Sequence, residues 1–146
     1  MPTADDFKKN WKNTLALLED CIQQNIGKYE EMSISLMGGE MFLDDPELDN
    51  IILEFIKALS KYKIEARITS NLLCKDLTGY KNAIKLLNDL KMDYNVHTSF
   101  DFGPLRFHKD EMLHRFKTNV YEILDYLKSF NKKLVTEVIR TKYMLN

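Results

Sequence analysis

The residues best suited to bind a ligand gather in three short segments of the chain. Gly38 and Gly39 precede Glu40, and two adjacent glycines let a backbone approach a ligand closely enough to bind it through N–H and C=O groups. Ser70 and Asn71 form the second segment. A plainer interpretation is also open, because Gly-Gly pairs, Ser and Asn commonly form tight turns and helix caps.

The third segment contains His97, Ser99 and Asp101, with Arg106 close behind. In parallel α/β sheets, ligands bind beyond the carboxyl ends of the strands, where loops and helix N-termini converge. If all three segments follow parallel strands, they meet at one edge of the sheet. Their shared position favours a binding site over three unrelated turns.

The spacing of apolar residues supplies the elements that would position these segments. Residues 5–26 form an apolar stripe typical of a helix, with Thr3 and Asp6 as a capping box and Gly27 past its end. Asp45 and Pro46 open a second helix. Strands are predicted at about 32–37, 64–69, 94–100 and 133–140, spaced by about 30 to 40 residues, the length of a βα unit.

This alternation predicts a single α/β domain over residues 1–146, in the order α-(βα)₃-β, with about four parallel strands. Each of the first three strands alternates polar with apolar residues, as in Glu65, Arg67 and Thr69, whereas a parallel strand buried on both faces is almost continuously apolar. We therefore expect helices on one face only. A partial barrel with a polar lumen for a ligand fits this pattern, and so does a sheet whose second face meets water or another chain.

The ordered set of motifs resembles radical SAM enzymes over about residues 10–146. Ser35-Leu36-Met37-Gly38-Gly39-Glu40 is similar to the end of their second strand, and Ile68-Thr69-Ser70-Asn71 to the end of their third. Thr98-Ser99-Phe100-Asp101 with Arg106 resembles the fourth strand end, and Val138-Ile139-Arg140-Thr141-Lys142 with Asn146 resembles the fifth.

The resemblance implies roles for these residues toward S-adenosylmethionine. Gly38, Gly39 and Glu40 would hold its amino group, and Ser99 and Arg106 would contact its ribose or carboxylate. An arginine fork suits a carboxylate and a glutamate suits an ammonium group. The rest of the predicted cofactor-binding set is Ser70, Asn71 and Asp101.

The chain departs from the family at the motif that starts its chemistry. The Cys-x3-Cys-x2-Cys triplet that ligates a [4Fe–4S] cluster is absent, and Cys21 and Cys74 are far apart in the sequence. Met41 replaces the usual proline. We expect no cluster, no catalytic residue and at most weak S-adenosylmethionine binding. The three histidines have no recognisable ligand spacing, so no metal site is predicted.

The composition of the chain limits the classes of partner that it is expected to bind. The net charge of −1 gives no general attraction to nucleic acid or to an anionic membrane, and no apolar run approaches the roughly 20 residues of a membrane span. The first residues lack the apolar stretch of a secretory signal, and the two cysteines are too few for a disulfide scaffold. A cytoplasmic protein is expected, in the host cytoplasm if the source is viral.

These observations predict a degenerate, non-catalytic radical-SAM-like protein, of the kind a phage or mobile element could carry. It would act by binding a protein partner or a second copy of itself. Two alternatives stay open: one subunit of a split enzyme whose cluster lies on another chain, and a binding domain for a small molecule resembling S-adenosylmethionine.

Overall fold

The computed structural model describes residues 3–36, 40–101 and 110–139, with the backbone alone at 99–101 and 137–139. Helices and strands alternate after a first helix, so the predicted α-(βα)₃-β order is confirmed. The elements are α1 (Ala4–Asn25), β1 (Ser33–Leu36), α2 (Pro46–Leu59), β2 (Glu65–Ser70), α3 (Thr78–Asp89), β3 (Asp93–Asp101), α4 (Asp110–Lys128) and β4 (Leu134–Ile139).

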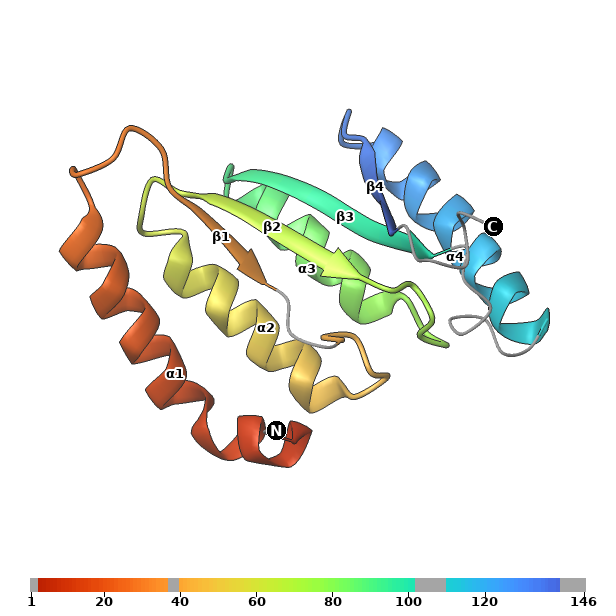
Figure 1. The fold of residues 1–146 in the computed structure, drawn as a ribbon, viewed down its shortest axis with the longest axis horizontal. Coiled ribbons are helices and arrows are strands. Elements are labelled where there is room, and N and C mark those ends of the chain that lie inside the picture. The colour runs from red at the N-terminus through yellow and green to blue at the C-terminus, as the bar shows by residue number, and fades with distance from the viewer. Residues whose placement is uncertain (1–2, 37–39, 102–109, 140–146) are drawn as a thin grey trace.

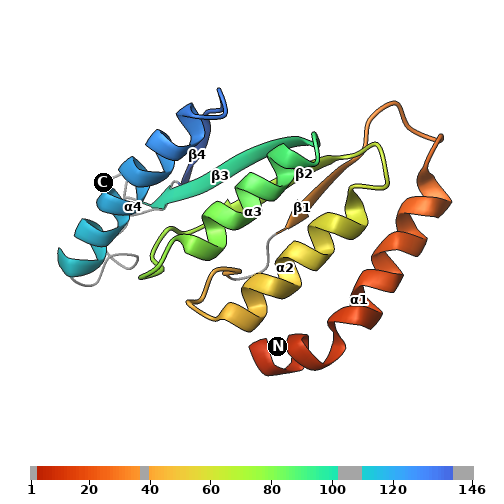
Figure 2. The same ribbon diagram turned by 180° about the vertical axis from the view of Figure 1, so that it is seen from behind.

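The strands form one parallel sheet in the order β1-β2-β3-β4. Because the spatial order follows the chain order and crossovers are right-handed, each connecting helix packs on the same face of the sheet. Figure 1 shows the strands in front of α2, α3 and α4, and Figure 2 shows the same helices from their own side. The result is an open, singly wound sheet, with β1 and β4 at its two edges.

The two faces of the sheet differ as the alternation predicts. Ala66, Ile68 and Ser70 of β2 are buried against the helices, whereas Arg67 and Thr69, on the opposite face, are only partly buried. We call this second side the free face. The buried core lies between the sheet and the helices and includes Leu48, Ile51, Ile52, Phe55, Ile56, Leu59, Tyr80, Ala83, Ile84, Leu87, Val96, Ile123 and Leu127.

The predicted helix ends are confirmed. Thr3 Oγ1 accepts a hydrogen bond from the Asp6 N–H, and the Asp6 carboxylate accepts one from the Thr3 N–H. Gly27 follows the end of α1 with φ of 83°, the left-handed conformation for which glycine has no Cβ penalty. Asp45 caps α2 by accepting from the Glu47 N–H. Within the described ranges, no helix combines the length and apolarity needed to cross a membrane.

The first helix packs beside α2 in the helix layer, and Figure 2 shows it at the outer end of that layer. The Phe7 and Trp11 rings lie 5.9 and 6.3 Å from the Phe55 ring of α2, measured between centroids. These two rings pack on a neighbouring helix, so α1 leaves the free face uncovered.

Candidate functional site

Glu40 joins the carboxyl ends of β1 and β2. Its Oε1 accepts hydrogen bonds from the Ser70 hydroxyl and from the Phe42 N–H, both at 3.0 Å. Its Oε2 accepts from the Asn71 N–H at 2.6 Å. Three of the predicted site residues therefore meet, as their places at strand ends suggested. The Glu40 carboxylate thus accepts hydrogen bonds from residues that follow β1 and from residues at the end of β2. Its role in the structure is to hold these two strand ends together.

The segment after β2 turns sharply at Leu72, which has a φ of 56° and a fully buried side chain. The Ser70 hydroxyl accepts from the Leu72 N–H at 3.1 Å, and the Asn71 side-chain oxygen accepts from the Leu73 N–H at 2.9 Å. Ser70 and Asn71 therefore also act as turn formers, which is the plainer interpretation that the sequence left open.

Two residues that the sequence analysis did not single out stabilise the same segment. The Asn119 amide of α4 donates to the Leu72 and Cys74 carbonyls, both at 2.9 Å. The Asp44 carboxylate accepts from the Lys75 and Asp76 N–H groups, also at 2.9 Å. The sequence does mark Asn119, because it is a polar residue within the apolar stripe of α4. Nothing in the neighbouring sequence marks Asp44.

The electrostatics of this region keep its thiol and phenol groups neutral. Burial, with the nearby negative charges of Asp44 and Glu40, raises the pKa of the Cys74 thiol to about 12. Burial also raises the pKa of Tyr80, whose ring lies 4.7 Å from that of Phe42. A thiol held in this protonated state is a poor nucleophile and a poor metal ligand.

The remaining predicted cofactor-binding residues are placed only in part. Ser99 and Asp101 belong to β3, where the backbone of Ser99 lies one residue beyond Thr98, the partner of Ser70 in the register. Their backbone therefore runs along the same end of the sheet as Glu40. Gly38, Gly39 and Arg106 lie outside the described residues.

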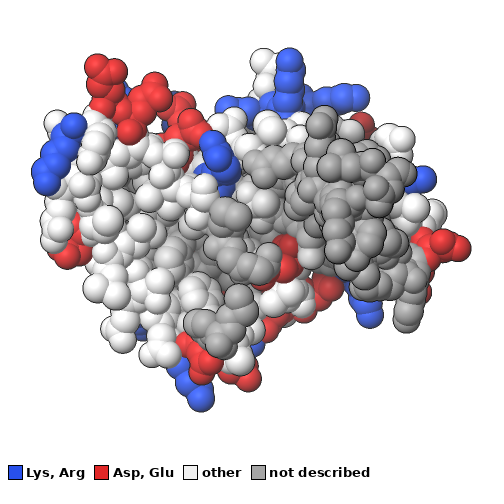
Figure 3. Space-filling view, viewed as in Figure 1, with Lys and Arg blue, Asp and Glu red and all other residues white. Residues whose placement is uncertain are grey.

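The free face carries rows of polar residues that cross the strands. Ser35, Arg67 and Asn95 are register partners on β1, β2 and β3. The next row joins Thr69 to His97, which is buried. Figure 3 looks onto this side of the molecule and shows both acidic and basic side chains around its rim, with a group of acidic ones at upper left and a group of basic ones at upper centre.

The cysteines of this chain do not match the [4Fe–4S] cluster that the radical SAM resemblance implies. A [4Fe–4S] cluster needs three closely spaced thiolates, but the chain has two cysteines, one exposed on α1 and one buried after β2. The donor set therefore does not fit a cluster. Elsewhere in the described structure, no group of three His, Cys, Asp or Glu side chains is arranged to hold a metal ion.

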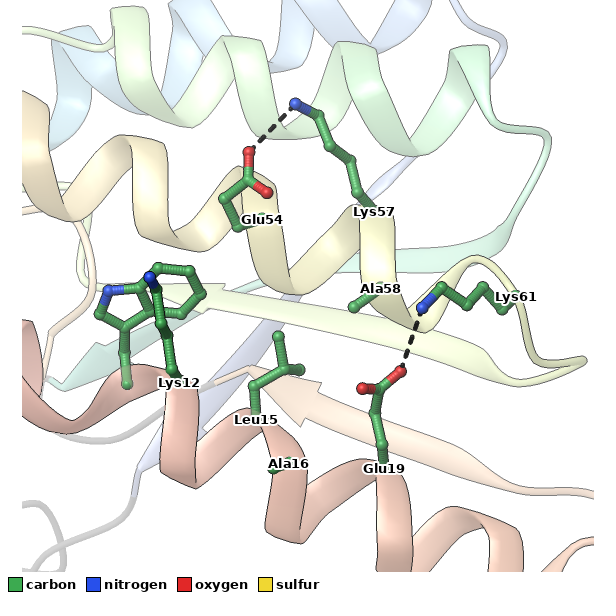
Figure 4. Close-up of a pocket in the computed structure, with 9 residues that line it drawn as sticks. Lys12, Leu15, Ala16, Glu19, Glu54, Lys57, Ala58 and Lys61 are labelled. Carbon is green, nitrogen blue, oxygen red and sulfur yellow. Dashed lines mark hydrogen bonds and ion pairs between the residues drawn. The ribbon is translucent and has the colours of Figure 1, made fainter.

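A shallow groove of about 460 Å³ lies between α1 and α2, away from the strand ends. Figure 4 shows Leu15 and Ala58 facing one another across it, with ion pairs on its rim. Lys57 pairs with Glu54 at 3.2 Å, and Lys61 with Glu19 at 3.6 Å. Lys12, the other charged residue of the lining, has its Nζ 5.6 Å from the centre of the Trp11 ring. Most of the charged groups of the groove therefore already have a partner within the chain.

Comparisons with known proteins found no matching family model, no matching curated protein and no matching solved structure.

Proposed function

We propose that this chain is a non-catalytic, radical-SAM-like binding domain that associates with a second copy of itself through the outer edge of β4. The observation that carries the proposal is the open sheet, in which β4 is hydrogen-bonded to β3 on one side only. An edge strand presents a row of N–H and C=O groups that can pair with another chain.

The composition of β4 suits such pairing better than that of β1. It is six residues long, against four in β1, and begins Leu134-Val135-Thr136, residues that favour strands. Val135 is 40% exposed, a large exposure for an apolar strand residue. Natural edge strands are often blocked by proline, by a bulge or by charged residues, above all lysine. The sequence of β4 contains neither proline nor lysine, and its one charged residue is Glu137.

Symmetry favours a second copy as the partner. A two-fold axis that relates two copies of one edge strand makes the pair antiparallel, and two-fold dimers are the commonest oligomers. The same residues then lie near the axis in both copies. The two four-stranded sheets would join into one continuous sheet, with both helix layers and both free faces retained.

The test is the mass of the purified protein, measured by light scattering over a range of concentrations. We expect the mass to rise from 17.2 kDa toward twice that value. Val135→Lys and Thr136→Lys should each return the protein to a monomer, because like charges would meet across the axis. Tyr121→Lys, which adds the same charge at a 70% exposed position on α4, is the matched control and should leave the dimer intact.

Four results would overturn the proposal. A monomer at every concentration removes self-association, and a dimer that survives both β4 variants moves the contact elsewhere. Radical chemistry recovered on adding a cluster-bearing chain would establish the split-enzyme alternative instead. Tight S-adenosylmethionine binding by the monomer, measured by calorimetry, would favour the small-molecule alternative.

A further inference from the structure

The free face contains one basic residue with no ionic partner in the described structure. Arg67 is the single Lys or Arg in the sequences of β1, β2 and β3. It lies on the middle row of the face, between Ser35 on one neighbouring strand and Asn95 on the other.

The guanidinium of Arg67 is incompletely satisfied. Its Nε is buried from solvent and has no hydrogen-bond partner, and no ion pair of Arg67 occurs among the described residues. Glu65 occupies the same face two residues earlier, yet its Oε1 accepts from the Asn95 amide at 2.7 Å. A buried donor without a partner destabilises the fold, and more so when the group is charged.

The register partners of Arg67 on the two adjacent strands are uncharged residues that form hydrogen bonds. Adjacent strands lie about 4.8 Å apart, so the backbones of Ser35 and Asn95 flank Arg67 closely on its two sides. Thr69 follows on the same face of β2. Hydroxyl and amide groups can add hydrogen bonds to an oxyanion without competing for its charge.

We infer that the free face binds a small oxyanion, a carboxylate or a phosphate, with Arg67 as its charged anchor and Ser35, Thr69 and Asn95 as flanking hydrogen-bonding residues. A guanidinium presents its N–H groups as a planar fork that matches two oxygens of either anion. The bound oxyanion would supply the acceptor that the Arg67 Nε lacks. Carboxylate and phosphate share this chemistry, and the experiment distinguishes them.

This inference is independent of the proposed self-association. The oxyanion would lie on the face of β1, β2 and β3, whereas the second copy would pair with the outer edge of β4. Binding is therefore expected in the monomeric Val135→Lys variant as well as in the wild type. A failure of one proposal leaves the other standing.

The test is a titration of the folded protein with inorganic phosphate and, separately, with citrate, followed by amide chemical shifts and calorimetry. We expect at least one anion to bind and to shift the amides of residues 35, 67 and 95. Arg67→Gln should weaken that binding about tenfold or more, and Arg67→Lys, which keeps the charge but loses the fork, should give an intermediate affinity.

Arg115→Gln is the matched control, because Arg115 lies on α4 and pairs with Glu111 at 3.1 Å. It should bind the anion as the wild type does. The anion that binds, phosphate or citrate, identifies the ligand class. The inference fails if neither anion binds, if Arg67→Gln binds as tightly as wild type while its circular dichroism is unchanged, or if Arg115→Gln loses as much affinity.

Discussion

Glu40 illustrates how one residue type supports two different interpretations. A glutamate after two glycines at a strand end suits an ammonium ligand, and the sequence predicted that role for it. In the structure its carboxylate accepts three hydrogen bonds from Ser70, Asn71 and Phe42 of its own chain. Sequence could place Glu40 beside Ser70 and Asn71, because parallel strand ends share an edge, but the direction of the carboxylate depends on the tertiary path of residues 40–42.

Replacing Glu40 with alanine should destabilise the fold. The substitution removes the acceptor of three hydrogen bonds and leaves partly buried donors unpaired, so we expect a loss of about 3 kcal/mol in the free energy of unfolding. Urea denaturation measures it. Glu40→Gln, which keeps an acceptor oxygen, should lose less, and Glu30→Ala at an exposed position should lose almost nothing. An equal stability of Glu40→Ala and wild type would contradict the strand-joining role.

Asp49 is expected to make the fold less stable as the pH rises. Burial is the main cause that raises the pKa of Asp49, and the negative charges of Asp45, Asp44 and Asp76 raise it further. A raised pKa means that the folded state holds the proton more tightly than the unfolded state does. Stability is therefore lost as the pH rises from the ordinary aspartate pKa, about pH 4, through the raised value.

Asp49→Asn should remove this loss, so the variant gains stability over wild type as the pH rises from about 3 to about 7. Asp76→Asn provides a control of opposite sign. Hydrogen bonds from the Thr78 hydroxyl and N–H lower the pKa of Asp76, so its contribution is present at neutral pH and is lost on acidification. Thermal melts across this range measure both differences. Equal slopes for the two variants would exclude this account of Asp49.

At the scale of helices and strands, local signals predicted most of what the structure contains. The capping box at Thr3, the glycine after α1 and the Asp45-Pro46 start of α2 are decided by a few neighbouring residues, so sequence suffices for them. The packing partner of α1 is a tertiary property. An apolar stripe indicates which side of a helix is covered but leaves open whether a sheet, another helix or a second chain covers it.

Trp11 should control how firmly α1 is attached. Ile22 is the one residue of α1 that is fully buried, and the aromatic contact of Phe7 and Trp11 with Phe55 supports the other end of the helix. Trp11→Ala should therefore speed hydrogen exchange across the first half of α1 by about tenfold, while β2 and β3 keep their protection. Leu17→Ala, at a position that is 72% exposed, is the matched control. Uniform loss of protection throughout the fold would contradict this prediction.

At the scale of the whole molecule, the chain order of the strands largely determines the architecture. Right-handed crossovers between neighbouring parallel strands place the connecting helices α2, α3 and α4 on one face, so polar alternation in β1, β2 and β3 could be interpreted correctly as a free face. The contacts that complete the strand-end region were less predictable. Asn119 and Asp44 reach it from segments far away in the sequence, and their partners are backbone groups, which leave no pattern of residue types.

The distribution of thiols over the molecule predicts the result of iron–sulfur reconstitution. Cys21 lies on α1, at the outer end of the helix layer, and Cys74 is buried in the segment after β2. Two thiols in separate parts of the fold, one of them held protonated with a pKa of about 12, cannot supply the three adjacent thiolates of a [4Fe–4S] cluster.

Anaerobic incubation with iron and sulfide, followed by gel filtration, should leave far less than four irons per chain. A Cys21→Ser, Cys74→Ser double variant should retain the same small amount, because that iron is bound non-specifically. Stoichiometric cluster in the wild type, lost in the double variant, would show that these cysteines meet and would reopen the case for radical chemistry.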